Sequence, residues 1–296
     1  MRVISWNINS VRARLTRLLA LLHRHKPDVV CLQETKISDR YFPVMQLGAA
    51  GYHAVLHGQS SYNGVAILVR GLTRQRNILA FADSQSPQAV DAASGPDMPT
   101  EVLRGFPYDP TPHDARIISA CVGGFRLVNA YVVNGQERNS DQFELKQRWM
   151  AALGNWLQSL PPTPPLLVVG DFNVAPGDSD VWDPEGLRER IHCTVEEREW
   201  LKNLQGKRLQ DLLRAITDEP GIYTWWPYMR GGFNRDEGLR FDLALGDKAM
   251  VDRVKRVWVD REERKPVGRL ENPSDHAPVI VDLAECDAAD HLRPTC

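Results

Sequence analysis

The sequence predicts an α/β fold in which mixed β-sheets are covered on the outside by helices. Short apolar runs, typical of buried strands, alternate with segments in which apolar residues recur at helical spacing. Several strand-like runs also follow one another without an intervening helix, which indicates mixed rather than purely parallel sheets. Polar residues suited to chemistry stand where the apolar runs end, and open α/β folds place their sites in the loops beyond strand ends.

The first part of the chain contains two predicted strands with a helix between them. Residues 3–7 form a short apolar run, and apolar residues then recur at helical spacing from Val11 to about His25. Pro27 ends this helix, and residues 28–32 form a second apolar run. Three further strands are expected at residues 64–69, 116–122 and 125–133.

The rest of the chain continues the alternation. Residues 83–112 are rich in Pro, Asp, Ser and Gly and are expected to be exposed and irregular. The proline run at 161–165 has the composition of an interdomain linker, but its five residues suit an ordinary connection between a helix and a strand. We expect one domain over residues 1–283 and a polar, frayed tail over 284–296. The remaining predicted elements are helices at 142–157 and near 195–204, and strands at 166–169, 241–245, 254–259 and 278–283.

Composition is that of an ordinary globular protein. The chain has 296 residues, 43% of them hydrophobic and 25% charged, which is enough to bury a core without disulfides or structural metals. A net charge of −2 argues against a general nucleic-acid binder coated in lysine, yet allows a local basic groove. The five cysteines form no C-x-x-C pair, and we expect reduced thiols in a cytoplasmic protein. No signal peptide or apolar run of about 20 residues is recognised, so neither secretion nor membrane insertion is expected.

Two polar segments follow strands and carry groups suited to proton transfer. The run at 167–169 delivers Asp171 and then Asn173, which could act as a general base with an orienting amide, or merely cap a turn. Farther on, Asp275 and His276 are adjacent and precede the last strand. A lone histidine more often has a structural role than a catalytic one, but the neighbouring carboxylate favours a function for His276. Asp242 could accept a hydrogen bond from the imidazole and raise its pKa, and the resulting imidazolium could bind a phosphate oxygen.

A third segment offers a metal ligand. Glu34 stands at the end of a buried strand. Mg²⁺ binds carboxylate oxygens, usually only one or two from the protein, so Glu34 could be such a ligand. The alternative is that Glu34 stabilises a helix N-terminus. The sequence contains no G-x-x-x-x-G-K-[ST], G-x-S-x-G or H-E-x-x-H motif. The remaining carboxylates, amides, histidine and tyrosine suit metal-assisted phosphoryl chemistry better than acyl transfer.

Aromatic residues and arginines interleave between Tyr223 and Arg240. Such a segment can hold phosphates and stack on bases, or it can be an aromatic core cluster. We expect one of its two tryptophans, Trp225 or Trp226, to belong to the core.

Together, these segments resemble the exonuclease III family of DNA-repair nucleases, which includes the major apurinic/apyrimidinic (AP) endonucleases. The resemblance covers residues 1–283, and its motifs come in the family's order. The matching segments are 5–12, 32–36, 62–66, 129–135, 170–176, 238–242 and 274–278.

The resemblance implies a four-layer α/β sandwich, with two mixed sheets packed face to face and helices outside. It also implies a Mg²⁺ or Mn²⁺ enzyme that cleaves duplex DNA 5′ to abasic sites, with 3′→5′ exonuclease and 3′-trimming activity on blocked ends. By position, the implied metal-site residues are Asn7, Glu34, Asp171, Asn173 and Asp275, with Asp275 at a second or alternative metal position. The implied catalytic residues are Tyr131, Asp171, Asn173, Asp242 and His276. The implied DNA-binding residues are Arg12, Tyr62, Asn63, Asn134, Trp225, Arg230, Leu239 and Arg240.

The sequence departs from the family pattern in places, and two other functions stay open. Asn9 stands where some relatives have an aspartate that binds metal, which puts a second metal ligand set in doubt. Differences around residues 226–233 put the balance between abasic-site cleavage and exonuclease action in doubt. We expect a monomer that acts on DNA. The alternatives are a phosphoesterase of the same fold acting on RNA or inositol phosphates, and a non-catalytic nucleic-acid-binding module.

Overall fold

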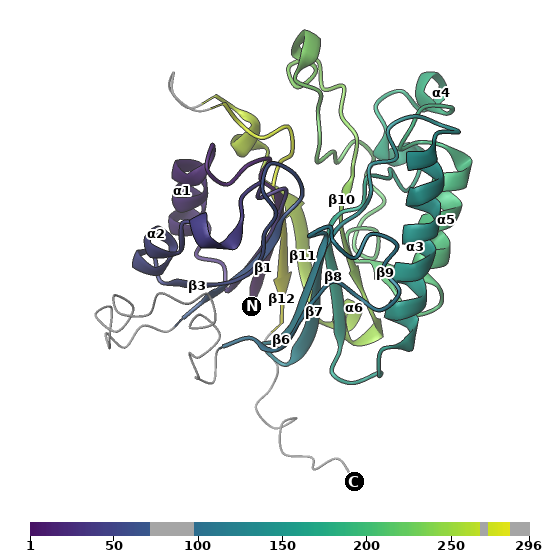
Figure 1. Ribbon diagram of the computed structural model, residues 1–296. Helices are drawn as coiled ribbons and strands as arrows, with labels where there is room; N and C mark the ends of the chain where they lie inside the picture. The colour runs from purple at the N-terminus through teal and green to yellow at the C-terminus, as the bar shows by residue number, and fades with distance from the viewer. Residues whose placement is uncertain (72–97, 267–271, 285–296) are drawn as a thin grey trace.

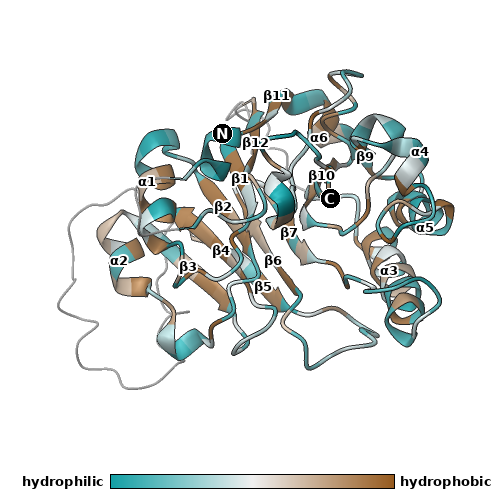
Figure 2. Cartoon of the chain, turned by 90° about the horizontal axis from the view of Figure 1, so that it is seen from above, coloured by the Kyte–Doolittle hydropathy of each residue, from teal (hydrophilic) through white to brown (hydrophobic). Residues whose placement is uncertain are grey.

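Two six-stranded mixed sheets form the centre of the protein, and helices lie on their outer faces (Figure 1). The computed structural model describes residues 1–71, 98–266 and 272–284. This arrangement confirms the predicted four-layer sandwich. Viewed from above, apolar strands occupy the middle of the molecule, and more polar helices flank them (Figure 2).

The first sheet has the order β11-β12-β1-β2-β4-β3, and β1 and β2 are its parallel pair. Its strands are β1 (Arg2–Asn7), β2 (Val29–Gln33), β3 (Tyr52–His57), β4 (Val65–Arg70), β11 (Val254–Val259) and β12 (Val279–Leu283). The second sheet has the order β5-β6-β7-β8-β10-β9, and β7 and β8 are its parallel pair. Its strands are β5 (Thr100–Arg104), β6 (Ile117–Val122), β7 (Phe125–Tyr131), β8 (Leu166–Asp171), β9 (Gln210–Asp211) and β10 (Asp242–Gly246).

The helices close both outer faces. Beside the first sheet lie α1 (Leu15–His25) and α2 (Val44–Ala49), and beside the second lie α3 (Asp141–Ser159) and α5 (Val195–Gln205) (Figure 1). The shorter helices are α4 (Pro184–Leu187), α6 (Lys248–Arg253) and the 3₁₀ turns η1 (Asp39–Tyr41), η4 (Asp178–Asp180), η5 (Met229–Gly231) and η6 (Arg261–Arg264).

Central strands are apolar along their whole length because both of their faces are buried. In β1, Val3 packs between the two sheets, whereas the next residue, Ile4, packs under the helices of the first sheet. In the second sheet, Val168 of β8 packs under α3 with Leu153. Since the alternate residues of a strand face different layers, these continuous apolar runs specify strands at the middle of a sandwich.

Several elements differ from the sequence predictions. The first helix begins at Leu15, because residues 11–14 form a turn. Part of the stretch expected to be irregular is the strand β5, whereas residues 83–97 lie outside the described residues. Pattern reading missed β3, β9 and the short helices α2, α4 and α6. The expected frayed tail lies outside the described residues from 285 onward.

Two expectations about the chain as a whole can be compared with the structure. Cys31, Cys121 and Cys193 are free thiols in the described part of the chain, as expected. Among the described residues, no helix combines the length and the apolar character that crossing a membrane requires.

Strand direction brings the polar residues to one edge of the sandwich. The parallel strands β1 and β2 end at Asn7 and Gln33, and the parallel strands β7 and β8 end at Tyr131 and Asp171. Because parallel strands end on the same side of a sheet, and the two sheets face each other, these four ends meet.

Candidate active site

Asn7 joins the two sheets at this edge. Its buried side-chain amide donates one hydrogen bond to Oε1 of Glu34 (2.8 Å) and another to Oδ2 of Asp171 (2.9 Å). Glu34 follows β2 in the first sheet and has a left-handed backbone (φ 52°), whereas Asp171 ends β8 in the second. Non-glycine residues adopt this conformation only where their surroundings enforce it, and such residues cluster at functional sites.

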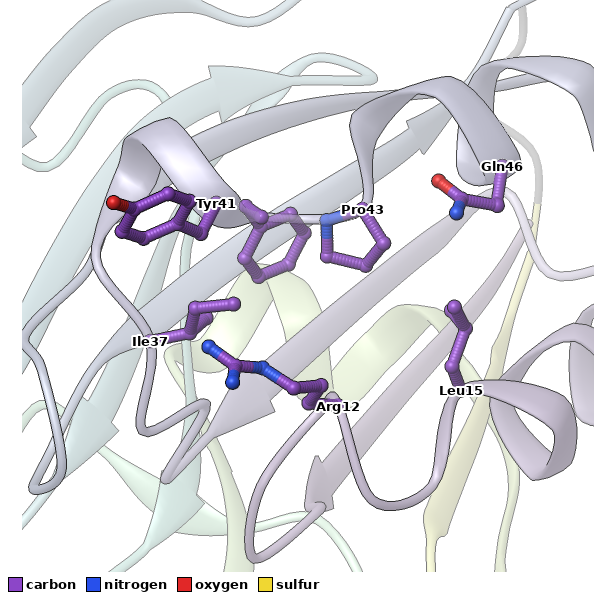
Figure 3. A pocket seen from close by; sticks show the side chains of 7 residues that line it. Arg12, Leu15, Ile37, Tyr41, Pro43 and Gln46 are labelled. Atoms are coloured by element: carbon purple, nitrogen blue, oxygen red, sulfur yellow. The ribbon is translucent and has the colours of Figure 1, made fainter.

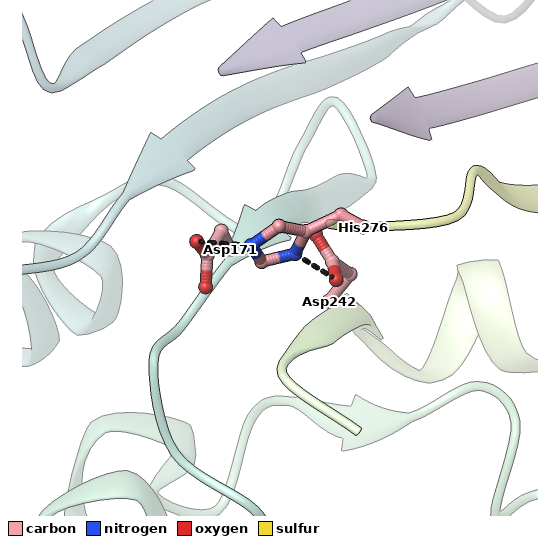
Figure 4. Close-up of side chains that lie close together, drawn as sticks. All are labelled: Asp171, Asp242 and His276. Atoms are coloured by element: carbon pink, nitrogen blue, oxygen red, sulfur yellow. Dashed lines mark hydrogen bonds and ion pairs between the residues drawn. The ribbon is translucent and has the colours of Figure 1, made fainter. Parts of the chain in front are cut away.

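His276 lies between two aspartates (Figure 4). Its Nδ1 is 2.8 Å from Oδ2 of Asp242, and its Nε2 is 3.7 Å from Oδ2 of Asp171. Burial alone would lower the pKa of His276, but the charges of Asp242 and then Asp171 raise it to about 10. The imidazole is therefore a cation at neutral pH, and the predicted partnership with Asp242 is present.

Asp171 has an unusually high proton affinity for an aspartate. Burial is the largest cause, and the negative charges of Asp242 and Glu34 add to it, whereas the charge of His276 and the hydrogen bond from Asn7 oppose it. The resulting pKa is about 7. A carboxylate with a pKa near neutrality suits the role of a general base.

Two asparagines extend the site along the second sheet. The backbone N–H of Asn173 donates to Oδ1 of Asp171 (2.9 Å), and its side-chain amide donates to the carbonyl of Val132 (3.0 Å). The amide of Asn134 donates to Oδ1 of Asn173 (3.0 Å). These bonds fix the turn after β8 relative to the loop after β7, with Asn173 in a left-handed conformation (φ 52°).

Asp275 lies at the other end of the site and is held by two donors. Asn9 donates to its Oδ1 (2.9 Å) and the indole of Trp225 to its Oδ2 (3.1 Å). Although burial raises the pKa of Asp275, the charge of His276 and these hydrogen bonds lower it further, so the carboxyl is ionised. Lys36 connects this end to Glu34, since its Nζ lies 2.7 Å from both Oδ1 of Asn9 and Oε2 of Glu34.

Tyr131 presents a protonated phenol to the same cluster. Burial, followed by the charges of Glu34 and Asp171, raises its pKa well above the ordinary value, and the guanidinium of Arg116 over its ring opposes this only in part. A phenol that keeps its proton can donate a hydrogen bond to an oxygen that gains charge.

The donor atoms fit a hard divalent cation. Asp171, Asp242 and His276 have potential ligand atoms within 4.8 Å of one another, but a protonated imidazole offers a metal no lone pair. The oxygens of Glu34 and Asp171, joined by Asn7, are the type that Mg²⁺ and Mn²⁺ prefer. A cation beside them would also offset the crowding of buried negative charge.

Five of the eight predicted DNA-binding residues are exposed or belong to the site. Arg12, Tyr62 (72% exposed) and Arg230 are exposed, Asn134 and Trp225 belong to the site, and these five stay predictions.

The other three predicted contacts have partners inside the protein, and they too stay predictions. Arg240 is 1% exposed, and Asp180 and Asp211 pair with its guanidinium. The side chain of Leu239 is buried in an apolar cluster. Asn63 is buried, and its amide donates to Gln59.

Arg12 borders a separate hollow in the surface next to the start of α1 (Figure 3). The hollow is lined by Arg12, Leu15, Ile37, Tyr41, Phe42, Pro43 and Gln46. Ile37 follows Glu34 closely along the chain, so the hollow borders the segment that comes after the candidate metal ligand.

Sequence reasoning missed two residues that bond the backbone of the site, the half-buried His192 and the fully buried Lys146. His192 places Nδ1 2.6 Å from the carbonyl oxygen of Asn173, and Lys146 donates to the same oxygen (2.7 Å). Lys146 did leave a signal, since it stands in register with the buried residues Phe143, Met150 and Leu153 of α3. A charge on the apolar face of a helix requires a buried partner.

Comparisons with known proteins agree with this geometry. Residues 4–76 and 96–276 match the model of the Endonuclease/Exonuclease/phosphatase family. The exodeoxyribonuclease III of Haemophilus influenzae is 31% identical over 94% of this chain and 98% of its own length. A 3′ phosphatase from Neisseria, solved with a product DNA hairpin, is 37% identical, with a TM-score of 0.83 over 96% of this chain and 99% of that one. An AP endonuclease from Archaeoglobus fulgidus is 28% identical, with a TM-score of 0.82 over 96% and 99%.

Proposed function

The chain belongs to the Endonuclease/Exonuclease/phosphatase family, and we propose that it is a DNA-repair nuclease that hydrolyses phosphodiester bonds with the help of a divalent cation. Its substrates would be duplex DNA with abasic sites, cut on the 5′ side, and 3′ ends, which it would shorten or unblock. The cation would be Mg²⁺ or Mn²⁺. We further propose one catalytic domain over residues 1–283, acting as a monomer in the cytoplasm.

The observation that supports this proposal most directly is the double hydrogen bond of Asn7. It brings Glu34, a candidate metal ligand, and Asp171, a candidate base, within reach of one amide at the junction of two sheets. His276 adds a positive charge 3.7 Å from the same carboxylate. A carboxylate for the cation, a base and a fixed cation for phosphate oxygens are the parts that phosphodiester hydrolysis needs.

Each protein group has a role that follows from its environment. Asp171, with a pKa near 7, would take the proton of the attacking water. His276, held as an imidazolium by Asp242, would bind a phosphate oxygen as negative charge develops. Tyr131, which keeps its proton, would donate to the same phosphate or to the leaving oxygen.

The asparagines and the metal complete the assignment. Asn134 and Asn173 would orient the phosphate and Asp171. Glu34, Asn7 and Asp275 would hold the cation, which when bound stabilises the negative charge of the transition state.

The relatives support both kinds of substrate. The Neisseria structures at 37% identity are described as a 3′ phosphatase and a 3′–5′ exonuclease. The AP endonuclease from Archaeoglobus fulgidus is 28% identical. The higher identity favours work at 3′ ends as the larger share of the activity, with abasic-site cleavage as the smaller one.

A gel assay with end-labelled DNA tests the proposal. The substrates are a duplex with one internal abasic-site analogue, the same duplex intact, and one with a 3′-phosphate, each incubated with Mg²⁺, Mn²⁺ or EDTA. One metal-dependent cut 5′ to the abasic site, a ladder from the 3′ end, or release of phosphate would each support the proposal and identify the activity. The absence of all three would contradict it. Turnover of RNA or an inositol phosphate would then favour the same-fold phosphoesterase, and binding that resists EDTA without turnover would favour the binding module.

A further inference from the structure

A buried ion pair lies directly beneath the active-site loops. Lys146 of α3 and Glu197 of α5 are both fully buried, and the Nζ of Lys146 contacts Oε1 of Glu197. Removing two charges from water is costly, and a pair of apolar side chains often fills such a space at no loss of stability. A core that needed only filling would not require this pair.

The ammonium group uses its remaining hydrogens on two backbone carbonyls. Lys146 donates to the carbonyl oxygen of Asn134 (3.2 Å) and to that of Asn173 (2.7 Å). An ammonium has three donors, so these two bonds and the contact with Glu197 account for all of them. Asn134 lies in the loop after β7 and Asn173 in the turn after β8, and their side chains are bonded to each other on the other side.

The backbone of both loops is shaped around this lysine. A Cβ on Gly135 would lie 3.0 Å from Cδ of Lys146, and Gly135 has a left-handed conformation (φ 89°). Asn173 also has a left-handed backbone (φ 52°), which side chains other than glycine adopt at a cost. Its carbonyl receives a further bond from His192 (2.6 Å), so its orientation is determined from two sides.

Glu197 fixes the lysine from the helix behind it. Its Oε2 accepts hydrogen bonds from Oγ1 of Thr194 (2.8 Å) and from the backbone N–H of Thr194 (3.4 Å). The backbone N–H of Glu197 donates to Oγ1 of Thr194 in return, and the two backbone bonds form the capping box of α5. The start of α5 therefore fixes the carboxylate of Glu197, and the carboxylate fixes the ammonium of Lys146 beneath the two loops.

We propose that Lys146 is a positioning residue for phosphodiester hydrolysis, which holds the carbonyls of Asn134 and Asn173 and so sets where their side chains and Asp171 meet the substrate. The inference rests on the proposed nuclease function. Lys146 itself is buried and touches no substrate. Its effect reaches the reaction through Asn173, whose backbone N–H donates to Oδ1 of Asp171 (2.9 Å).

The test separates positioning from stability by means of four variants. E197Q keeps the amino group of Lys146, which has enough N–H donors for both carbonyl bonds whether it is charged or neutral. K146M/E197Q removes the donor without leaving a buried charge, and K146Q/E197Q restores a shorter, neutral donor. L153A is the matched control, because Leu153 is fully buried in the same helix and its truncation destabilises the core without removing a hydrogen bond from these loops. For each variant, Tm, kcat and KM are measured on the best DNA substrate of the wild type.

We expect kcat of K146M/E197Q to fall about 100-fold, with KM within about 3-fold of the wild type, because small misplacements of catalytic groups have effects of this size. K146Q/E197Q should recover about a tenth of the activity of E197Q, and L153A should stay within about 3-fold of the wild-type kcat. Equal kcat for K146M/E197Q and E197Q would overturn the inference. If the methionine variant is unfolded at the assay temperature, the comparison of K146Q/E197Q with E197Q decides in the same way. A wild type that cleaves no DNA would refute the nuclease function, whereas an active wild type with equally active variants would refute only the role of Lys146.

Discussion

Nδ1 of His276 lies 2.8 Å from Oδ2 of Asp242, and both side chains are buried. Burial disfavours the imidazolium, yet the carboxylates of Asp242 and Asp171 raise the pKa of His276 to about 10. The protein thus holds a positive charge at the site throughout the neutral pH range, and Asp242 is the largest source of that stabilisation.

The first prediction concerns D242N and pH. Without the carboxylate, the pKa of His276 falls, so the imidazolium that the wild type keeps up to about pH 10 is lost at a lower pH. We expect kcat/KM of the variant to decrease by a further 10-fold or so as pH rises from 6 to 9, relative to the wild type at each pH. The measurement is a pair of pH–rate profiles at saturating Mg²⁺. Parallel profiles, offset by a constant factor, would contradict the assigned role of Asp242.

The second prediction separates the base from the binding groups. In D171N, the group that would deprotonate water is replaced by an amide of the same shape. We expect kcat to fall by about 10³-fold or more, while the Kd for DNA stays within about 3-fold. Single-turnover rates and fluorescence anisotropy with labelled duplex give the two quantities. Turnover near the wild-type level would remove Asp171 from the role of base.

The third prediction concerns the cation. Glu34 offers carboxylate oxygens to a metal and is bonded by Asn7 and Lys36. We expect E34Q to need about 10- to 100-fold more Mg²⁺ for half-maximal activity, and EDTA to abolish the activity of the wild type. Titration of activity against Mg²⁺ measures this. E101Q is the control, since Glu101 is exposed and its partners among the described residues are Arg126 and Cys121. A Mg²⁺ requirement of E34Q equal to that of E101Q would exclude Glu34 as a ligand.

The fourth prediction concerns the DNA surface. Arg12 is exposed beside the hollow near α1, which also borders the segment after Glu34. If it binds a phosphate, R12A should weaken DNA binding and lower the slope of log K against log salt by about one ion, without changing Tm. Binding measured at four salt concentrations gives the slope. An unchanged slope would show that Arg12 binds no phosphate.

The sequence predicted the site residues that follow strands, because such residues meet wherever parallel strands end. Glu34, Asp171 and Tyr131 needed only correct strand assignments to be placed at one edge. The pairing of His276 with Asp242 was also predicted, on the resemblance as well as on chemistry.

Residues with distant partners could not be predicted in this way. Arg240 stands among aromatic residues and has the local pattern of a DNA contact, but Asp180, which lies 60 positions earlier, pairs with it in the interior. The same holds for Lys146, whose partner Glu197 lies on another helix. Short helices such as α2 and the strand β3 were missed because six residues give too little periodicity to decide their type.

The last prediction uses this interior network to test stability against pH. Asp180 pairs with Arg240 (2.7 Å) and Arg214 (2.5 Å), and although burial raises its pKa, the two guanidinium groups lower it below the ordinary value. A carboxyl whose folded pKa is depressed contributes stability above its unfolded pKa of about 3.9 and loses it as pH falls through the folded value. D180N should therefore be less stable than the wild type by about 3–5 kcal/mol at pH 5 to 8, and the difference should shrink below about pH 4.

Urea unfolding at pH 7, 5, 4 and 3 measures this difference. D252N is the control, because Asp252 pairs with Lys248 in an exposed i,i+4 bridge, and its loss should change the free energy of unfolding by no more than about 0.5 kcal/mol. A D180N penalty that is as large at pH 3 as at pH 7 would mean that the lost stability comes from packing and not from the charge of Asp180. A penalty no larger than that of D252N would mean that Arg240 is held adequately by Asp211 alone, which lies 2.7 Å from its guanidinium.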